Sequence, residues 1–279
     1  MKKNLLKVYN LYRRFSAAYS SRSLGAYSSQ AAFFLFISFF PFCALLFGTI
    51  KALPFRGADA GAKIALALPG IMGNVITEAY ASAGKYPAAA VIPITAILTL
   101  WASSKGVFAV ACGVESAYGG KAPGGLKKRA LSILHTLFLI ASLILSLFLL
   151  VFGNFVFGFL TELFPALTKL AIALKALRAA LTFATISVFF ILVYMFFPAR
   201  KQRLRDTLPG AALSGLSWIA ISYGYSLYID YYMAKGSTLY GSLTAAVLLL
   251  FWLDMCMSVT LAGGLLNSYL LRNRAKRLL

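Results

Sequence analysis

The stretch 246-AVLLLFWLDMCMSVTLAGGLLN-267 is long and apolar enough to cross a membrane, yet it contains an aspartate, Asp254. About 20 apolar residues suffice to cross the roughly 30 Å hydrocarbon core of a bilayer. Asp254 is the only charged residue between Lys235 and Arg272. The sequence therefore raises two questions, the fold class of the chain and the role of this carboxyl group.

The whole chain has the composition of an integral membrane protein. Of its 279 residues, 61% are hydrophobic and only 12% are charged, whereas soluble domains are about half apolar and a quarter charged. Apolar runs occupy most of the length, so a separate aqueous domain is not expected. We predict a single membrane domain.

Apolar runs between charged residues predict an all-α bundle with six transmembrane helices. The runs lie near residues 27–50, 87–111, 131–155, 179–197, 208–230 and 240–267. Before them, apolar and basic side chains alternate at helical spacing, which predicts a cytoplasmic amphipathic helix on the inner leaflet, or one packed against the cytoplasmic loops. The expected plan is this helix within 1–25, the membrane domain over 26–271, and a basic cytoplasmic tail over 272–279.

Lys and Arg residues are distributed unequally between alternate loops. Eighteen of the 27 fall in residues 2–22, 121–129, 200–205 and 272–277, and eight fall in the opposite loops. By the positive-inside rule, both termini are expected in the cytoplasm. The net charge of +20 is thus assigned to topology and to anionic lipid headgroups at the cytoplasmic face, with no nucleic acid partner. The predicted location is the bacterial cytoplasmic (inner) membrane, crossed several times.

Familiar catalytic patterns are missing from the sequence. There is one histidine, His135, and no HExxH, GxSxG, Walker A or dinucleotide-binding glycine motif. Cys43, Cys112 and Cys256 lie in apolar runs and form no CxxC pair. We expect no enzyme, no metal site and no cofactor.

Asp254 is costly in an apolar span, by about 2.5–3.5 kcal/mol near the bilayer centre. It is therefore expected to face the bundle interior or water. Candidate partners on other spans are Ser103, Ser104, Lys105, Gln30, Ser38, Ser217 and Tyr225. Two interpretations remain open, a residue of a transport pathway and a polar staple between helices worth about 1 kcal/mol.

Other residues give local expectations. Pro41 frees a backbone carbonyl inside the first span and is expected to kink it. Glu115 is expected at the cytoplasmic surface as an ion-pair partner of Lys121 or of the basic cluster 127–129. Asp206 is expected to pair with the basic residues beside it in the sequence. Small residues, namely Gly210, Ser214, Ser217, Gly263 and Gly264, predict close helix contacts.

Three stretches carry the pattern of a known family. The first is 30-QAAFFLFISFFPFCALLFG-48, with a Ser-x-x-Pro pattern, and the second is 101-WASSKGVFAVACGVESAYG-119, with Trp, small polar residues and a basic-Gly pair. The third runs from 208-LPGAALSGLSW-218 through 237-STLYGSL-243 to Trp252 and Asn267. Together they resemble the YihY/BrkB family of inner-membrane proteins, formerly labelled the ribonuclease BN family. The likeness covers nearly the whole chain.

The last span departs from this family pattern at two positions. The family usually has Tyr two residues after the Trp of the sixth span, where this chain has Asp254, and Glu before the closing Leu-Asn, where this chain has Leu265. The two positions are eleven residues apart and therefore lie on nearly the same helix face. We interpret Asp254 as replacing a carboxylate that the family keeps nearer the cytoplasm.

The resemblance implies a six-span protein whose relatives are linked to envelope lipid export, virulence or serum resistance. Our leading hypothesis is a transporter or flippase-like protein for a lipid or amphipathic solute, passive or ion-coupled. Its polar pathway would comprise Asp254, Ser103, Ser104, Lys105, Ser38, Tyr240, Gly241 and Ser242. The alternative is a noncatalytic envelope scaffold or assembly factor, with a homo-oligomer or an envelope protein as partner. Ribonuclease activity is disfavoured.

Overall fold

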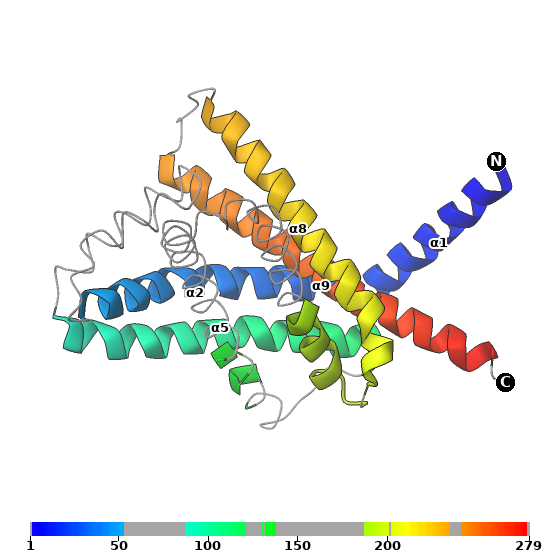
Figure 1. The fold of residues 1–279 in the computed structure, drawn as a ribbon, viewed down its shortest axis with the longest axis horizontal. Coiled ribbons are helices and arrows are strands. Elements are labelled where there is room, and N and C mark those ends of the chain that lie inside the picture. Colours follow the sequence, from blue (N-terminus) through cyan, green and yellow to red (C-terminus); the bar gives the residue numbers. More distant parts are fainter. Residues whose placement is uncertain are drawn as a thin grey trace, which may run out of the picture.

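The computed structural model describes most of the predicted helical regions. It covers residues 2–52, 87–120, 130, 132–134, 136–137, 187–200, 202–234 and 241–277. The helices are α1 (Lys2–Ser21), α2 (Leu24–Ala52), α5 (Ala88–Tyr118), α8 (Leu204–Ala234) and α9 (Gly241–Arg277), together with a shorter apolar helix, Ser187–Phe196 (Figure 1). No strand occurs in these residues, so the predicted all-helical fold is confirmed for the part of the chain described.

Three of these helices are long and apolar enough to cross a membrane. They contain the segments Leu24–Thr49, Ala89–Tyr118 and Ala246–Arg274, which correspond to the first, second and sixth predicted runs. Helix α8 covers the fifth run but is not one of the three. Most of the third run and residues 179–186 of the fourth lie outside the described residues, so the count of six spans stays a prediction.

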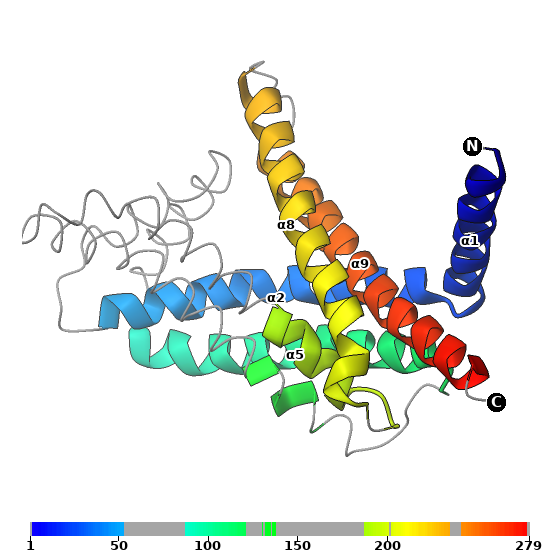
Figure 2. The ribbon, with the colours of Figure 1, turned by 45° about the vertical axis from the view of Figure 1, so that its right-hand side comes forward.

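Helices α2 and α5 pack along their length in opposite directions. Gly48 of α2 faces Ile92, Gly106 of α5 faces Leu35, and Gly113 of α5 faces Tyr27. Helix α9 crosses this pair, and α8 packs along α9 (Figures 1 and 2). The glycines allow close helix approach, since packing rather than the hydrophobic effect holds helices together in a membrane.

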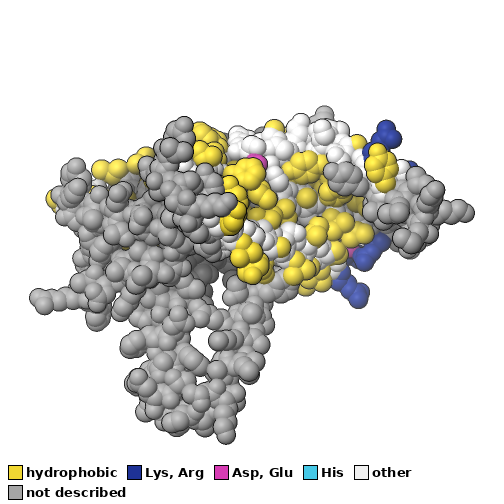
Figure 3. All heavy atoms as spheres, turned by 90° about the horizontal axis from the view of Figure 1, so that it is seen from above, with side chains coloured by type: hydrophobic (Ala, Val, Ile, Leu, Met, Phe, Trp, Pro, Cys, Tyr) yellow, Lys and Arg dark blue, Asp and Glu magenta, His cyan; other side chains and the backbone are white. Residues whose placement is uncertain are grey.

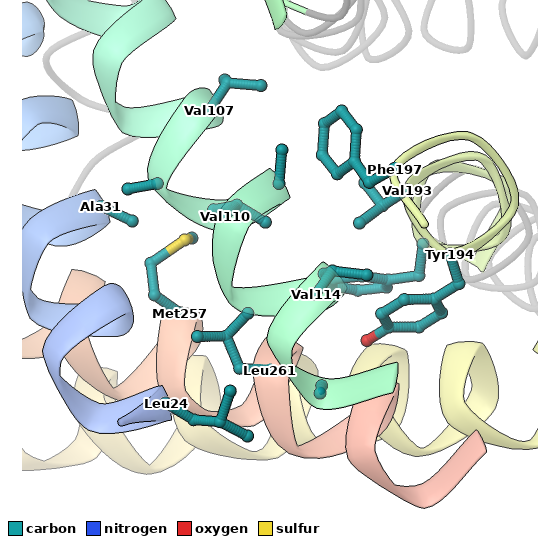
Figure 4. Packing of buried hydrophobic residues seen from close by; sticks show 14 of the residues in the cluster. Leu24, Ala31, Val107, Val110, Val114, Val193, Tyr194, Phe197, Met257 and Leu261 are labelled. Carbon is teal, nitrogen blue, oxygen red and sulfur yellow. The ribbon is translucent and has the colours of Figure 1, made fainter. Parts of the chain in front are cut away.

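The core lies where α2, α5, α9 and the segment after Ser187 meet. Its members include Leu24, Val114, Tyr194 and Leu261, which converge in Figure 4. The Tyr194 ring is fully buried, but its hydroxyl points toward α8 and α9, where it finds polar partners. The core is therefore mainly apolar, and the Tyr194 hydroxyl is satisfied by polar groups at the α8–α9 contact.

One end of the bundle, here called the basic end, gathers Arg22, Gly119, Asp206 and Arg272. Here α2 begins, α5 ends, α8 begins and α9 approaches its C-terminus (Figure 1). On the face shown in Figure 3, the Lys and Arg side chains likewise lie at one end of the described surface. The charge-rich segments described thus share one end, whereas their orientation in the cell stays a prediction.

Helices α2 and α9 are continuous across Pro41 and across the start of the expected tail, and the kink expected at Pro41 stays a prediction. Helix α2 runs through Pro41 as one helix to Ala52, and α9 continues into the expected tail as far as Arg277. Helix α5 ends in a Schellman motif, in which Gly119 (φ 84°) and Gly120 donate their N–H groups to Ser116 and Glu115. The left-handed Gly119 lets the chain leave α5 at the basic end.

Candidate functional site

The carboxylate of Asp254 accepts a hydrogen bond from the hydroxyl of Ser29 on α2. The Oγ to Oδ1 distance is 2.8 Å, and the pair lies at the surface of the bundle. The partner is thus Ser29, not one of the residues suggested from the sequence. Ser29 lies five residues past the start of α2, about 7.5 Å along the helix axis. Along the axis of α2, Asp254 therefore lies closer to the basic end than to the middle of the helix.

A second hydrogen bond joins the same two helices one turn further along. Ser258 Oγ donates to Ser28 Oγ at 3.0 Å. Ser28 is buried, Ser258 is intermediate and Ser29 is exposed. These four residues, Ser28, Ser29, Asp254 and Ser258, are called the α2–α9 polar site. It leads from the outer surface into the bundle.

Two aromatic rings flank this site on the outer surface. Phe33 follows Ser29 by one turn of α2, and Phe251 precedes Asp254 by one turn of α9. Their side chains are 50% and 58% exposed. A carboxylate and hydroxyls beside exposed rings suit a molecule with a polar head and an apolar body.

The other serines of the expected pathway bond to their own helices. Ser38 Oγ donates to Leu35 O at 2.8 Å, Ser104 Oγ donates to Trp101 O at 2.9 Å, and Ser103 Oγ donates to Thr99 O. Such bonds satisfy a hydroxyl within a transmembrane helix. In this structure these three hydroxyls do not reach Asp254.

Lys105 lies on a different flank of α2 from Asp254. Its Nζ is 3.8 Å from the ring centroid of Trp101 and 5.2 Å from that of Phe34, a cation–π arrangement. Phe34 and Ser29 are five residues apart, which separates them by about 140° around α2. Lys105 and Asp254 therefore mark separate polar positions.

The turn expected to complete the pathway lies at the far end of α9. Tyr240 is outside the described residues, while Gly241 and Ser242 open α9. Gly241 precedes Asp254 by thirteen residues, about 20 Å of helix. The described part of this turn is therefore remote from the α2–α9 polar site.

The α8–α9 contact holds a hydrogen-bond network that the sequence indicated only as close packing. Tyr194 OH lies 2.7 Å from Ser214 Oγ and donates to Thr260 O at 2.6 Å. Trp218 Nε1 donates to Cys256 O at 2.9 Å. Near the basic end, Gly210 N donates to Asn267 Oδ1 at 2.7 Å. The Gly-x-x-x-Ser-x-x-x-Trp spacing of 210–218 is the sequence signal for this seam, since it repeats once per turn.

Two acidic residues at the basic end depart from expectation. Glu115 is only 6% exposed and accepts the backbone N–H of Ala199 at 2.5 Å, so it is not a surface residue. Its expected partners, Lys121 and the cluster 127–129, lie outside the described residues. Asp206 forms an ion pair with Arg274 of α9 at 2.8 Å, and not with the basic residues next to it in sequence. Both acids thus connect distant segments. Within the described ranges, no three His, Cys, Asp or Glu side chains are grouped as metal ligands.

Comparison with known proteins adds the family. The model of the family described as "Virulence factor BrkB" matches residues 15–278. The chain belongs to the BrkB family. It is similar to the Bacillus subtilis (strain 168) protein named "Putative ribonuclease-like protein YfkH", with 25% identity over 250 residues, 89% of this chain and 90% of that protein. No solved structure matches.

Several residues of the family pattern lie at one interhelical contact of this structure. The chain is a membrane protein of the BrkB family with apolar helices. The stretch 208–218 and the residues Trp252 and Asn267, by which the sequence resembled the family, lie together in the α8–α9 seam. The family pattern in this region is thus largely a pattern of interhelical contacts. Asp254 lies on the other side of α9, toward α2.

Proposed function

We propose that this BrkB family member is a transporter or flippase-like protein for a lipid or amphipathic solute. Movement would be passive or ion-coupled, and the chain would cross the bacterial inner membrane six times with both termini in the cytoplasm. The observation that carries the proposal is the hydrogen bond between Ser29 and Asp254 at the outer surface of the bundle. Asp254 is half-buried at this surface, and a carboxylate in an apolar bundle is costly unless it meets a polar group there.

The neighbouring residues narrow the class of solute. Asp254 supplies negative charge and hydrogen-bond acceptors, while Ser28, Ser29 and Ser258 supply hydroxyls between α2 and α9. Phe33 and Phe251 offer apolar surface beside them. These features favour an amphiphile with a cationic or hydrogen-bond-donating head over one with an anionic head.

The proposal is tested by trans-bilayer movement of labelled lipid in proteoliposomes. Asp254→Asn keeps the shape of the side chain but removes the charge, so it should reduce the protein-dependent rate about tenfold. Asp206→Asn is the matched control because it makes the same chemical change at an ion pair away from the α2–α9 polar site. Equal rates for wild type and Asp254→Asn would contradict a pathway through this residue.

A second candidate, a noncatalytic envelope scaffold, is favoured by the position of α1. This helix projects away from the bundle (Figure 2), and Tyr9 on it is 61% exposed. Among the side chains of α1 that the structure describes, Phe15, Ala18 and Tyr19, in its C-terminal part, pack against the core. Such a helix can bind either the membrane surface or a partner protein.

Crosslinking from α1 separates the scaffold from the transporter. A photoreactive group at position 9 should capture lipid if α1 lies on the membrane, and one protein in fixed stoichiometry if α1 recruits a partner. The scaffold is rejected if removal of residues 2–14 leaves cell growth and envelope composition unchanged.

We also propose that the chain is not an enzyme. A test for ribonuclease activity of the purified protein checks this directly, and RNA cleavage by the purified chain would contradict it.

A further inference from the structure

Arg22 clamps the α1–α2 turn onto the end of α5. Its guanidinium donates to the carbonyl oxygen of Ala117. In return, Ser116 Oγ donates to the carbonyl oxygen of Arg22 at 3.0 Å. These two contacts fix the position of a cation just before the apolar run of α2 begins at Leu24.

Arg272 of α9 approaches the same turn of α5. A Cβ atom placed on Gly119 would lie 2.5 Å from Nη2 of Arg272, so the missing side chain of Gly119 leaves the space that this guanidinium occupies. Burial, and then the positive charge of Arg272, lower the pKa of Arg22. Two like charges are therefore held close together at the basic end.

The described acids of the basic end are bound elsewhere. Asp206 pairs with Arg274, and Glu115 accepts the N–H of Ala199. No ion pair to Arg22 or Arg272 occurs within residues 2–52, 87–120, 187–200, 202–234 and 241–277. The C-terminal end of α5 contributes only about half a negative charge. The arginine pair thus keeps a local excess of positive charge.

We propose that Arg22 and Arg272 together bind a phosphate group, with the headgroup of an anionic phospholipid as its source. Guanidinium groups bind phosphate through paired, charge-assisted hydrogen bonds. Arg22 lies two residues before the apolar run of α2, and Arg272 approaches Gly119 at the same end of the bundle, the level at which lipid phosphates border a transmembrane helix. A bound phosphate would join α9 to the α1–α2 turn. This inference is independent of transport through the α2–α9 polar site.

The experiment measures phosphatidylglycerol binding to the purified full-length chain in detergent by native mass spectrometry. Replacing both arginines, Arg22→Gln with Arg272→Gln, should weaken binding of the tightest lipid about tenfold. The matched control is Arg13→Gln with Arg14→Gln, which removes the same charge from exposed positions of α1 and should change binding less than about twofold. Equal loss in the two double variants would overturn a specific site.

Two additions keep the result decisive. Arg272→Gln alone leaves the contact of Arg22 with Ala117 intact, so it covers the case in which the double variant does not fold; unchanged affinity in this single variant overturns the proposal. Competition with inorganic phosphate distinguishes the sources. Displacement of the lipid by phosphate supports a site for soluble phosphate at the same arginines, and retention of the lipid supports the headgroup.

Discussion

At Gly263, three segments meet with no room for a side chain. A Cβ atom at this position would lie 2.5 Å from Tyr194 OH and 2.8 Å from Gly210 O, and it would clash with Ser214 Oγ. Two of these atoms belong to the hydrogen-bond network of the seam, and the third is backbone, so none can move cheaply. The tight packing of α8 on α9 depends on this glycine.

Gly263→Ala should therefore destabilise the bundle by about 1–3 kcal/mol, the usual cost of overpacking. The measurement is thermal unfolding in detergent, followed by loss of helical circular dichroism. Gly224→Ala is the control, since its Cβ would meet nothing within 4 Å, and it should leave the unfolding temperature unchanged or raised. Equal melting of the two variants would show that the seam is looser than described.

At the scale of elements, α9 is the helix that packs against α2, α5 and α8. Asp254 and Ser258 face α2, whereas Cys256, Thr260 and Asn267 face α8 or Tyr194. The amide of Asn267 is fully buried and bridges Gly210 N and Thr207 O. Its two bonds tie the start of α8 to the end of α9.

Asn267→Ala leaves two buried backbone groups without this partner, so it should lower the free energy of unfolding by about 1 kcal/mol. Asn273→Ala makes the same change at an exposed position of the same helix and should be neutral within about 0.5 kcal/mol. Denaturant titration of both variants checks the difference. A neutral Asn267→Ala would mean that the bridge has no net effect on stability.

At the scale of the whole molecule, the starts of α2 and α8 and the ends of α5 and α9 share the basic end. Combined with the charge distribution, this predicts that the basic end faces the cytoplasm. In a chain with its three cysteines replaced, single cysteines at Arg203 and Asn273 should be shielded from an impermeant thiol reagent in intact cells. Cysteines at Pro87 and Tyr231, toward the other end, should react. Labelling of positions 203 and 273 with protection of positions 87 and 231 would show that the basic end faces the outside, contrary to this prediction.

Helices α2, α5 and α9 could be predicted from the sequence because each is a long apolar run whose length suits a membrane. Their contacts could not. The sequence indicates Gln30 rather than its neighbour Ser29 as a partner of Asp254, since the pattern of one helix does not fix its rotation against another. The partner of Asp206 could not be predicted, because Arg274 lies far away in sequence and is brought close only by folding, and the burial of Glu115 depends on the segment at Ala199 that packs over it. The α8–α9 contact is easier to predict from the sequence, because small residues such as glycine are typical of close helix contacts in membranes.

The most direct test of the central claim compares two labelled lipids that differ only in a free or an acetylated head amine. Because Asp254 carries negative charge beside exposed Phe rings, wild-type proteoliposomes should move the free amine about five- to tenfold faster. In Asp254→Asn proteoliposomes, that ratio should fall to about one. A ratio unaffected by Asp254→Asn would contradict the account, since the carboxylate would then play no part in selecting the solute.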